Sequence, residues 1–291
     1  MKPFKESIID AKDPFPVDVF IQDNEKANVI VNSHWHDCIE ILYMIEGTAQ
    51  QQVNDKKFDV FEHDIIILNK GDIHGTWCEK EATTKILVIK FMPEIMETLY
   101  SHVFETGYIL TFLNKQNKQN FYVPNTHQNA HEIFDVLMGI YREFSGHQTG
   151  YEIYIKGYIY QLIALLIRND MLGCYDIAAQ HQELAKLKPV LTYIEQHYKE
   201  EISLVHAANM ANMSYYHFSR FFKKVTGKNY KEYIDFVRIC EAEKHILSEH
   251  ANISHVAYEV GFNNVSSFNR VYKRVRGYPP SAIKKAKNGK I

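Results

Sequence analysis

The sequence predicts an α+β protein of two domains. An antiparallel β domain with trailing helices comes first, and an all-helical domain with two helix-turn-helix motifs follows. Short apolar segments separated by turn residues run from about residue 28 to 91, and helical spacing takes over after residue 128. In addition, the phrase "HFSRFFKKVTG" at 217–227 returns, nearly unchanged, as "SFNRVYKRVRG" at 267–277. Two matching phrases in register indicate a duplicated structural unit.

The first part of the chain has the pattern of short antiparallel strands. Aliphatic, β-branched and aromatic residues dominate "IEILYMIE", "DIIIL" and "TTKILVIKF", and the shorter segments "TAQQQV", "FDVF" and "IHGTW" lie between them. Gly47, Asn54, Gly71 and Pro93 interrupt these segments with turn-forming residues. Short strands at this spacing predict a sandwich or barrel.

A helix is predicted over 151–169, and it is apolar on more than one face. Such a helix has to be covered on several sides. Packing against its own β domain is one explanation. We favour additional packing against a second copy of the chain, which predicts a homodimer. The short irregular segment 173–181 is the expected linker, and an amphipathic helix is expected over 186–199.

Each copy of the repeated phrase follows a short helix and a turn. The turns fall at Asn212 and Gly261, residue types that tolerate a left-handed backbone. Each copy is therefore a predicted helix-turn-helix, and a helix over 230–248 joins the two. The expected N-terminal caps are Ser203, Ser214 and Ser254, with a capping box formed by Asn229 and Glu232.

The net charge of −2 conceals a difference between the two ends of the chain. Residues 184–291 contain 18 Lys and Arg against 9 Asp and Glu, a charge of +9, whereas residues 1–183 carry −11. A basic C-terminal domain favours an anionic partner, although a purely solvated surface would give the same count.

The second helix of each motif presents polar side chains on the face opposite its aromatic residues. Arginine binds guanine with two hydrogen bonds and asparagine does the same with adenine, while Lys224, Arg274 and Arg276 suit phosphates. Ordinary solvated charges are the alternative, which two basic copies disfavour. The candidate DNA-binding residues are Tyr216, Ser219, Arg220, Lys223, Lys224, Ser266, Asn269, Arg270, Lys273 and Arg274.

These residues lie in a stretch, 186–287, that resembles the DNA-binding domain of AraC-type (AraC/XylS family) transcription regulators. The segment "ISHVAYEVGFNNVSSFNRVYKRVRGYPPSAIKK" is similar to the family signature. Pro279, Ile283 and Tyr230 depart from it, but none lies on the outward faces. The resemblance implies two motifs that enter successive major grooves of double-stranded DNA, and hence a sequence-specific regulator.

The β domain contains a group of histidines. His34, His36 and Glu40 are all even-numbered, so one extended strand would present them on one face, and His74 follows on another predicted strand. "HWHDCIEILYMIEG" and "GDIHG" resemble the two cupin motifs, whose matching residues bind metals in cupins. The departures from those motifs are Asn28, Asn69 and Cys78.

AraC-type regulators often have a cupin-like front domain that serves as an effector pocket. We therefore expect residues 1–170 to form a cupin-like (jelly-roll) domain that dimerises and binds a small molecule, such as a sugar or related metabolite. His34, His36, Glu40 and His74 would line its pocket without a metal or other cofactor. A metal site and purely structural histidines are the alternatives.

Residues 184–291 are the expected DNA-binding domain, and the resemblance leaves room for a contact with RNA polymerase. A metal-dependent cupin enzyme joined to a DNA-binding module is the rival interpretation. It would need a general acid or base beside the metal, and the sequence indicates none, so no enzymatic activity is expected. The N-terminus does not resemble a secretory signal, the four cysteines are scattered, and no segment resembles a membrane span. These features favour the cytoplasm.

Overall fold

The structure is a computed structural model, and it divides the chain into two compact units. One comprises Met1–Met96 with Lys115–Tyr175, and the other Glu97–Asn114 with Asp176–Ile291. Among the described residues, no helix is both long and apolar enough to cross a membrane. The described residues are 3–6, 15–25, 29–78, 83–96, 108–109, 112–113, 121–169, 177–246 and 252–282.

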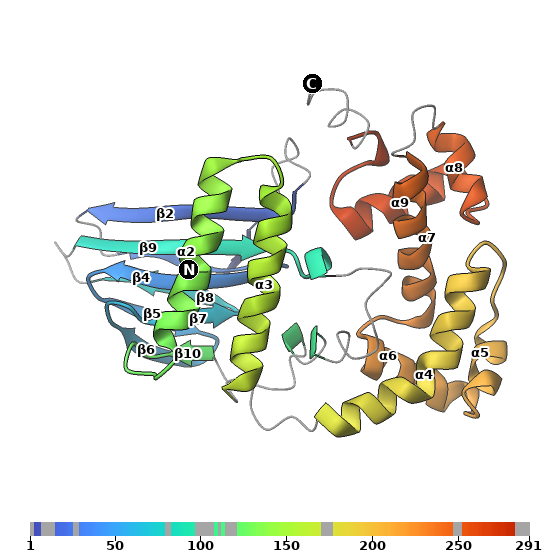
Figure 1. Cartoon of the computed structure of the whole chain (residues 1–291), viewed down its shortest axis with the longest axis horizontal. Coiled ribbons are helices and arrows are strands. Elements are labelled where there is room, and N and C mark those ends of the chain that lie inside the picture. Colours follow the sequence, from blue (N-terminus) through green and yellow to red (C-terminus); the bar gives the residue numbers. More distant parts are fainter. Residues whose placement is uncertain are drawn as a thin grey trace. The chain divides into compact units, whose positions relative to one another are not determined.

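The first unit contains two five-stranded sheets (Figure 1). Sheet A has the order β1 (Phe4–Lys5), β3 (Val29–Trp35), β8 (His74–Trp77), β5 (Ala49–Val53), β6 (Lys56–Val60). Sheet B has the order β10 (Phe121–Val123), β7 (Ile65–Leu68), β4 (Ile39–Glu46), β9 (Thr83–Phe91), β2 (Val17–Glu25). Neighbouring strands are antiparallel except for β1 and β3. The predicted sandwich is confirmed, while β1, β2 and β10 were not predicted.

Strand β4 is buried on both faces, which explains its continuous run of apolar residues. Leu42 and Met44 belong to the core between the two sheets. Tyr43, on the opposite face, packs against Phe134 of helix α2 (Ala130–Gly146), with ring centroids 5.0 Å apart. Because Tyr43 contacts α2 on this face, helix α2 covers the outer face of sheet B. A short 3-10 helix, η1 (Pro93–Met96), follows β9.

Helix α3 (Tyr151–Arg168) packs beside α2 and is largely covered by its own unit. Ile155, Ile159 and Leu162 are at most 1% exposed. Ile153 and Tyr154, in contrast, are 76% and 61% exposed. The apolar character of this helix is thus mostly explained within one chain, and the predicted dimer depends on a narrower surface.

The second unit is helical. Its elements are α4 (Ile177–His197), α5 (Leu204–Met210), α6 (Tyr215–Thr226), α7 (Tyr230–Ile246), α8 (Ile253–Glu259) and α9 (Val265–Arg276). The linker prediction is wrong for 177–181, which begin helix α4, while 173–176 lie outside the described residues. Helix α4 also extends well ahead of the helix expected at 186–199.

Helix α7 contributes to two separate apolar cores, one for each helix-turn-helix. Ile234 and Val237 pack with the first motif, whose buried aromatic residues include Phe218 and Phe222. Further along α7, Ile239, Ala242 and Ile246 pack with Phe268, Val271 and Tyr272 of the second motif. Sharing one helix between two cores fixes the two motifs in a single unit.

The two motifs close their turns in the same way. Asn212 and Gly261 have φ of 53° and 92°, as predicted for left-handed turn residues. In each turn an amide donates to a carbonyl five residues earlier: Met213 to Ala208 at 2.9 Å and Phe262 to Ala257 at 3.0 Å. The second loop is one residue longer, because α8 follows α5 by 49 residues whereas α9 follows α6 by 50.

The caps confirm most of the predicted helix starts. Ser203 and Ser214 accept hydrogen bonds from the amides of His206 and His217. Asn229 and Glu232 form the reciprocal capping box, with contacts of 2.9 and 3.0 Å. The prediction for Ser254 is wrong, because Asn252 is the cap and accepts from the amide of Ser254 itself. Asparagine at this position satisfies the same exposed amides as serine would.

Candidate DNA-binding surface and histidine cluster

Helices α6 and α9 each bury one face and expose the face predicted to bind DNA. Tyr216, Arg220 and Lys223 are exposed on α6, with Ser219 half-buried. On α9, Ser266, Asn269, Arg270 and Lys273 are exposed. The structure thus places the predicted residues on outward faces of both second helices.

Two of the predicted phosphate-binding cations are paired within the unit. Lys224 Nζ lies 2.6 Å from Glu183 of α4, and an Arg274 guanidinium nitrogen lies 3.0 Å from Asp235 of α7. Both cationic side chains are more than half exposed. These contacts orient the side chains but leave their charge accessible to a polyanion.

Arg276 is not a surface cation, and its assignment as a phosphate contact is wrong. Its side chain is only 14% exposed, and it donates to both carboxylate oxygens of Glu243 at 2.8 and 2.7 Å. Tyr272 donates to the same carboxylate at 3.1 Å. In a sequence, a basic residue at the end of a helix is typical of a phosphate contact. The structural role of Arg276 becomes evident only from the position of Glu243 in the folded unit.

A groove of about 380 Å³ runs between α7 and α9. Arg270 and Arg274 line it from α9, and Lys231 from the first turn of α7. Lys231 was missed in the sequence because α7 is the connecting helix and belongs to neither motif. It lines the same groove as the two arginines, together with the acidic residues Glu232 and Asp235.

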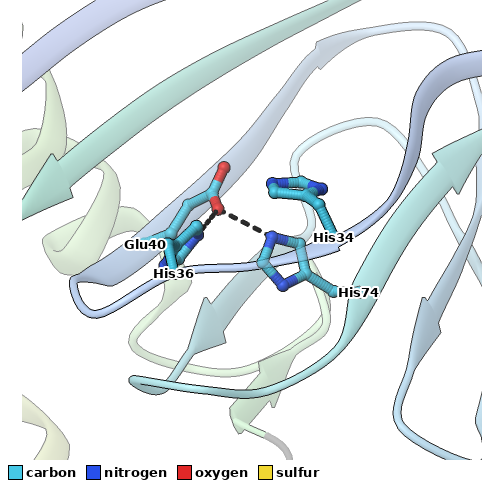
Figure 2. A group of neighbouring side chains, drawn as sticks. All are labelled: His34, His36, Glu40 and His74. Carbon is cyan, nitrogen blue, oxygen red and sulfur yellow. Dashed lines mark hydrogen bonds and ion pairs between the residues drawn. The ribbon is translucent and has the colours of Figure 1, made fainter. Parts of the chain in front are cut away.

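Four side chains of the first unit form what we call the histidine cluster, consisting of His34, His36, Glu40 and His74 (Figure 2). Glu40 Oε2 lies 2.6 Å from His36 Nε2 and 3.0 Å from His74 Nε2. All four residues are at most 5% exposed. Their four possible ligand atoms lie within 4.8 Å of one another.

The structure brings the four residues together, but not in the way expected from the sequence. His34 is in β3 of sheet A, and Glu40 is in β4 of sheet B, so no single strand presents both. His36 lies in the short segment 36–38, which connects β3 of sheet A to β4 of sheet B. His74 joins from β8, whose register pairs it with His34. The cluster therefore bridges the two sheets.

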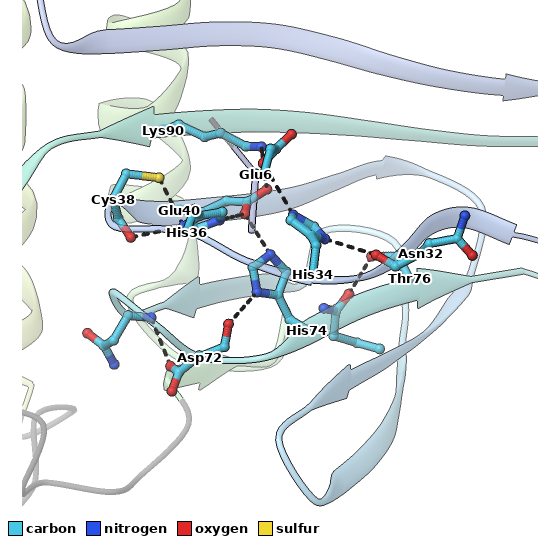
Figure 3. Close-up of polar contacts among 12 residues, drawn as sticks. Glu6, Asn32, His34, His36, Cys38, Glu40, Asp72, His74, Thr76 and Lys90 are labelled. Carbon is cyan, nitrogen blue, oxygen red and sulfur yellow. Dashed lines mark hydrogen bonds and ion pairs between the residues drawn. The ribbon is translucent and has the colours of Figure 1, made fainter. Parts of the chain in front are cut away.

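Backbone carbonyls fix the orientation of all three imidazoles (Figure 3). The Nδ1 atoms of His34, His36 and His74 lie 2.9, 3.2 and 3.0 Å from the carbonyl oxygens of Asn32, Cys38 and Asp72. A carbonyl only accepts, so each Nδ1 carries the hydrogen and each neutral ring turns an Nε2 lone pair inward. Metal-binding histidines are held in this way in proteins.

The inward-facing atoms fit a divalent transition metal. Three Nε2 lone pairs and a carboxylate are all acceptors, which repel one another unless protons or a cation lie between them. Nε2 of His34 is buried and has no hydrogen bond of good geometry among the described residues. The donor set, rich in nitrogen, matches zinc or another first-row metal rather than calcium or magnesium.

Two further charged residues beside the cluster were not predicted. Glu6 Oε2 lies 3.3 Å from His34 Nε2 and 2.7 Å from Lys90 Nζ, and Lys90 lies 3.8 Å from Glu40 Oε1 (Figure 3). Lys90 is 6% exposed although it lies on a strand of apolar residues. Lys90, near the end of the apolar segment "TTKILVIKF", was the available signal for a buried charged partner, since buried lysines are rare without one. Glu6 gave no such signal, because nothing in the sequence shows that β1 pairs with β3.

Contacts among these residues shift their pKa values. Burial opposes ionisation of Glu40, but its contacts with His36 and His74 outweigh burial and hold its pKa well below the usual range. The contact with His34 lowers the pKa of Glu6 to about 2, with further help from Lys90. Burial disfavours the charged form of Lys90, yet the carboxylates of Glu40 and Glu6 raise its pKa above the ordinary value. Both carboxylates are therefore ionised at neutral pH.

Comparisons with known proteins agree with this architecture. The family model described as AraC-like ligand binding domain matches residues 16–163, and the model described as Helix-turn-helix domain matches residues 207–286. The HTH-type transcriptional regulator YdeC of Bacillus subtilis, itself uncharacterized, is 25% identical over 90% of this chain and 89% of its own length. The HTH-type transcriptional activator RhaS of Salmonella arizonae is 22% identical over 88% of both chains.

Two solved structures show similarity at low identity. Fatty acid-bound ToxT of Vibrio cholerae is 12% identical with a TM-score of 0.38, over 92% of this chain and 94% of its own. The DNA-binding domain of AdpA in complex with DNA is 23% identical with a TM-score of 0.34, over 36% of this chain and 94% of its own.

A ligand-binding β domain and a unit with two helix-turn-helix motifs together define a DNA-binding transcription regulator with a small-molecule partner. The chain belongs to the AraC family of transcription regulators.

Proposed function

We propose that this regulator reads specific DNA sequences with the exposed faces of α6 and α9. The observation that supports this most is the duplicated outward face, in which Arg220 and Arg270 occupy matching positions on two helices joined by α7. Tyr216, Ser219, Asn269 and Ser266 would contact base edges beside them. The cations Lys223, Lys224, Lys273 and Arg274 would bind phosphates, which adds affinity without base preference.

Binding to a site selected from random DNA tests this assignment. Arg220→Ala or Arg270→Ala should each cost about 1–3 kcal/mol of affinity for that site, while binding to unrelated DNA changes far less. Lys224→Ala should weaken binding to all sequences and reduce the salt dependence. Lys186→Ala, an exposed lysine outside both motifs, is the control. Full specific affinity after loss of both arginines would exclude the proposed reading helices.

We also propose that residues 1–170 bind the effector at the histidine cluster and that residues 184–291 bind DNA. Imidazole and carboxylate groups suit a polyol or a carboxylate, such as a sugar or related metabolite. His36→Ala should therefore weaken the effector response of the full chain and leave effector-independent DNA binding unchanged. An unaltered effector response in this variant would place the effector elsewhere.

The family supports a regulator over an enzyme, and we propose no catalytic activity. The rival, a metal-dependent cupin enzyme, draws support from the donor set of the histidine cluster. A metal bound there would supply a Lewis acid. We further propose that the protein acts in the cytoplasm and contacts RNA polymerase. We also propose that it forms a homodimer through the exposed part of α3 at Ile153 and Tyr154.

A further inference from the structure

The N-terminal strand brings a second carboxylate to the histidine cluster. Strand β1 pairs with β3 so that Phe4 lies opposite His34, and the Phe4 ring stacks on the imidazole with centroids 5.7 Å apart. The next contact, from the amide of Glu6 to the carbonyl of Trp35 at 2.9 Å, extends this pairing. Lys5 adds a salt bridge to Asp37 on the far side. The Glu6 side chain is thereby directed at the cluster (Figure 3).

Glu6 complements the one histidine that Glu40 does not contact. His36 and His74 both approach Glu40 Oε2, whereas Nε2 of His34 lies 3.3 Å from Glu6 Oε2. If Glu6 were only a counterion for Lys90, nothing would require the same oxygen to approach His34. Three inward nitrogens thus converge with two carboxylates. Glu40 faces His36 and His74 in this group, and Glu6 adds a second carboxylate beside His34.

The charges of this group favour a divalent cation with both carboxylates. With a divalent metal, Glu40 and Lys90 alone would leave a net charge of +2 in a buried site, and Glu6 reduces it to +1. Each uncompensated buried charge is costly, so the second carboxylate stabilises the loaded state.

The distances are close to those that a metal needs. Bonds of about 2.1 Å place neighbouring ligand atoms about 3.0 Å apart at right angles and about 3.4 Å apart in a tetrahedron. The contacts made by Glu40 and Glu6 with the imidazoles are 2.6, 3.0 and 3.3 Å. The four ligand atoms of the cluster lie within 4.8 Å of one another, so the more distant side chains would move inward to bind the ion.

We propose that Glu6 is a ligand of a divalent transition metal held by the histidine cluster. The bound metal would then stabilise the position of β1 at the edge of sheet A. The sequence led us to expect a metal-free pocket, and this inference instead places a metal among the side chains proposed to bind the effector. We take the cluster as the ligand site proposed above, on which this inference rests.

Metal titration of the full chain tests this role of Glu6. The protein is purified without a polyhistidine tag, stripped with a chelator and titrated with Co²⁺ and Zn²⁺, with visible absorption and chelator competition as readouts. Glu6→Gln should weaken binding about 10–100-fold and change the intensity of the Co²⁺ bands. Lys5→Gln, on the same strand, removes the salt bridge to Asp37 but leaves Glu6 and the four cluster residues in place, so its affinity should stay near wild type. Circular dichroism of the metal-free proteins verifies that each variant is folded.

Proteolysis supplies a second readout. Metal should slow tryptic cleavage after Lys5 in the wild-type chain and have no such effect in Glu6→Gln. Equal affinity and equal Co²⁺ spectra for Glu6→Gln and wild type would overturn the role of Glu6, as would an equal loss in Lys5→Gln and Glu6→Gln. If the wild-type chain binds neither metal while His36→Ala still weakens the effector response, the metal inference fails and the proposed function stands.

Discussion

Replacing Arg276 by methionine separates a structural role from a DNA-binding role. The guanidinium is 14% exposed, makes two hydrogen bonds to Glu243 and lies 3.2 Å from Cys240 Sγ. Methionine keeps most of the side-chain volume, but among the described residues it leaves the Glu243 carboxylate with only the Tyr272 hydroxyl. Breaking a fully buried ion pair costs about 3–5 kcal/mol. Because the Glu243 side chain is 21% exposed, we expect a loss of about 2–4 kcal/mol in the free energy of unfolding.

Chemical denaturation and the salt dependence of DNA binding measure the two roles independently. The structure predicts that Arg276→Met lowers the denaturation midpoint of the second unit and leaves the slope of log affinity against log salt unchanged under folded conditions. Lys273→Met, an exposed cation on the same helix, should reduce the slope by about one unit without a change in stability. A reduced slope for Arg276→Met, combined with wild-type stability, would refute the reasoning.

Two other changes probe the turn and the proposed dimer. Gly261→Ala should destabilise the second motif by at least about 2 kcal/mol in denaturation experiments, because φ is +92° and the added Cβ would lie 2.5 Å from the carbonyl oxygen of Lys199. Asn212→Gly, at a φ of 53°, should stay close to wild type, and equal losses in both variants would contradict this reading. Ile153→Glu should release monomers in sedimentation experiments without unfolding, whereas Leu162→Glu should unfold the first unit. A wild-type chain that is monomeric at every concentration would exclude the dimer.

The sequence was sufficient to predict the fold where local signals and tertiary structure agree. The turns at Asn212 and Gly261 and the two cores around Phe218 and Phe268 follow from residue type and helical spacing. Ser254 shows the limit, since two neighbouring cap residues compete and local chemistry alone does not decide between them.

The site was predicted less completely than the fold, because its remaining parts depend on contacts between distant segments. His34, His36, Glu40 and His74 were recognised from a motif, although two sheets rather than one strand bring them together. Glu6 reaches the cluster only through a two-residue strand, β1, which carries no periodic signal. Arg276 was misread for the same reason, since its partner Glu243 lies 33 residues earlier in the chain.

A complete single-base substitution profile of the selected DNA site is the most direct test of two separate reading helices. Affinities of the wild-type chain, Arg220→Ala and Arg270→Ala are measured for every substituted site. We predict that each variant loses discrimination of about 1–3 kcal/mol at its own segment, with the two segments about 10 base pairs apart. Profiles identical to wild type in both variants, or losses at one shared segment, would contradict the claim that both motifs read DNA.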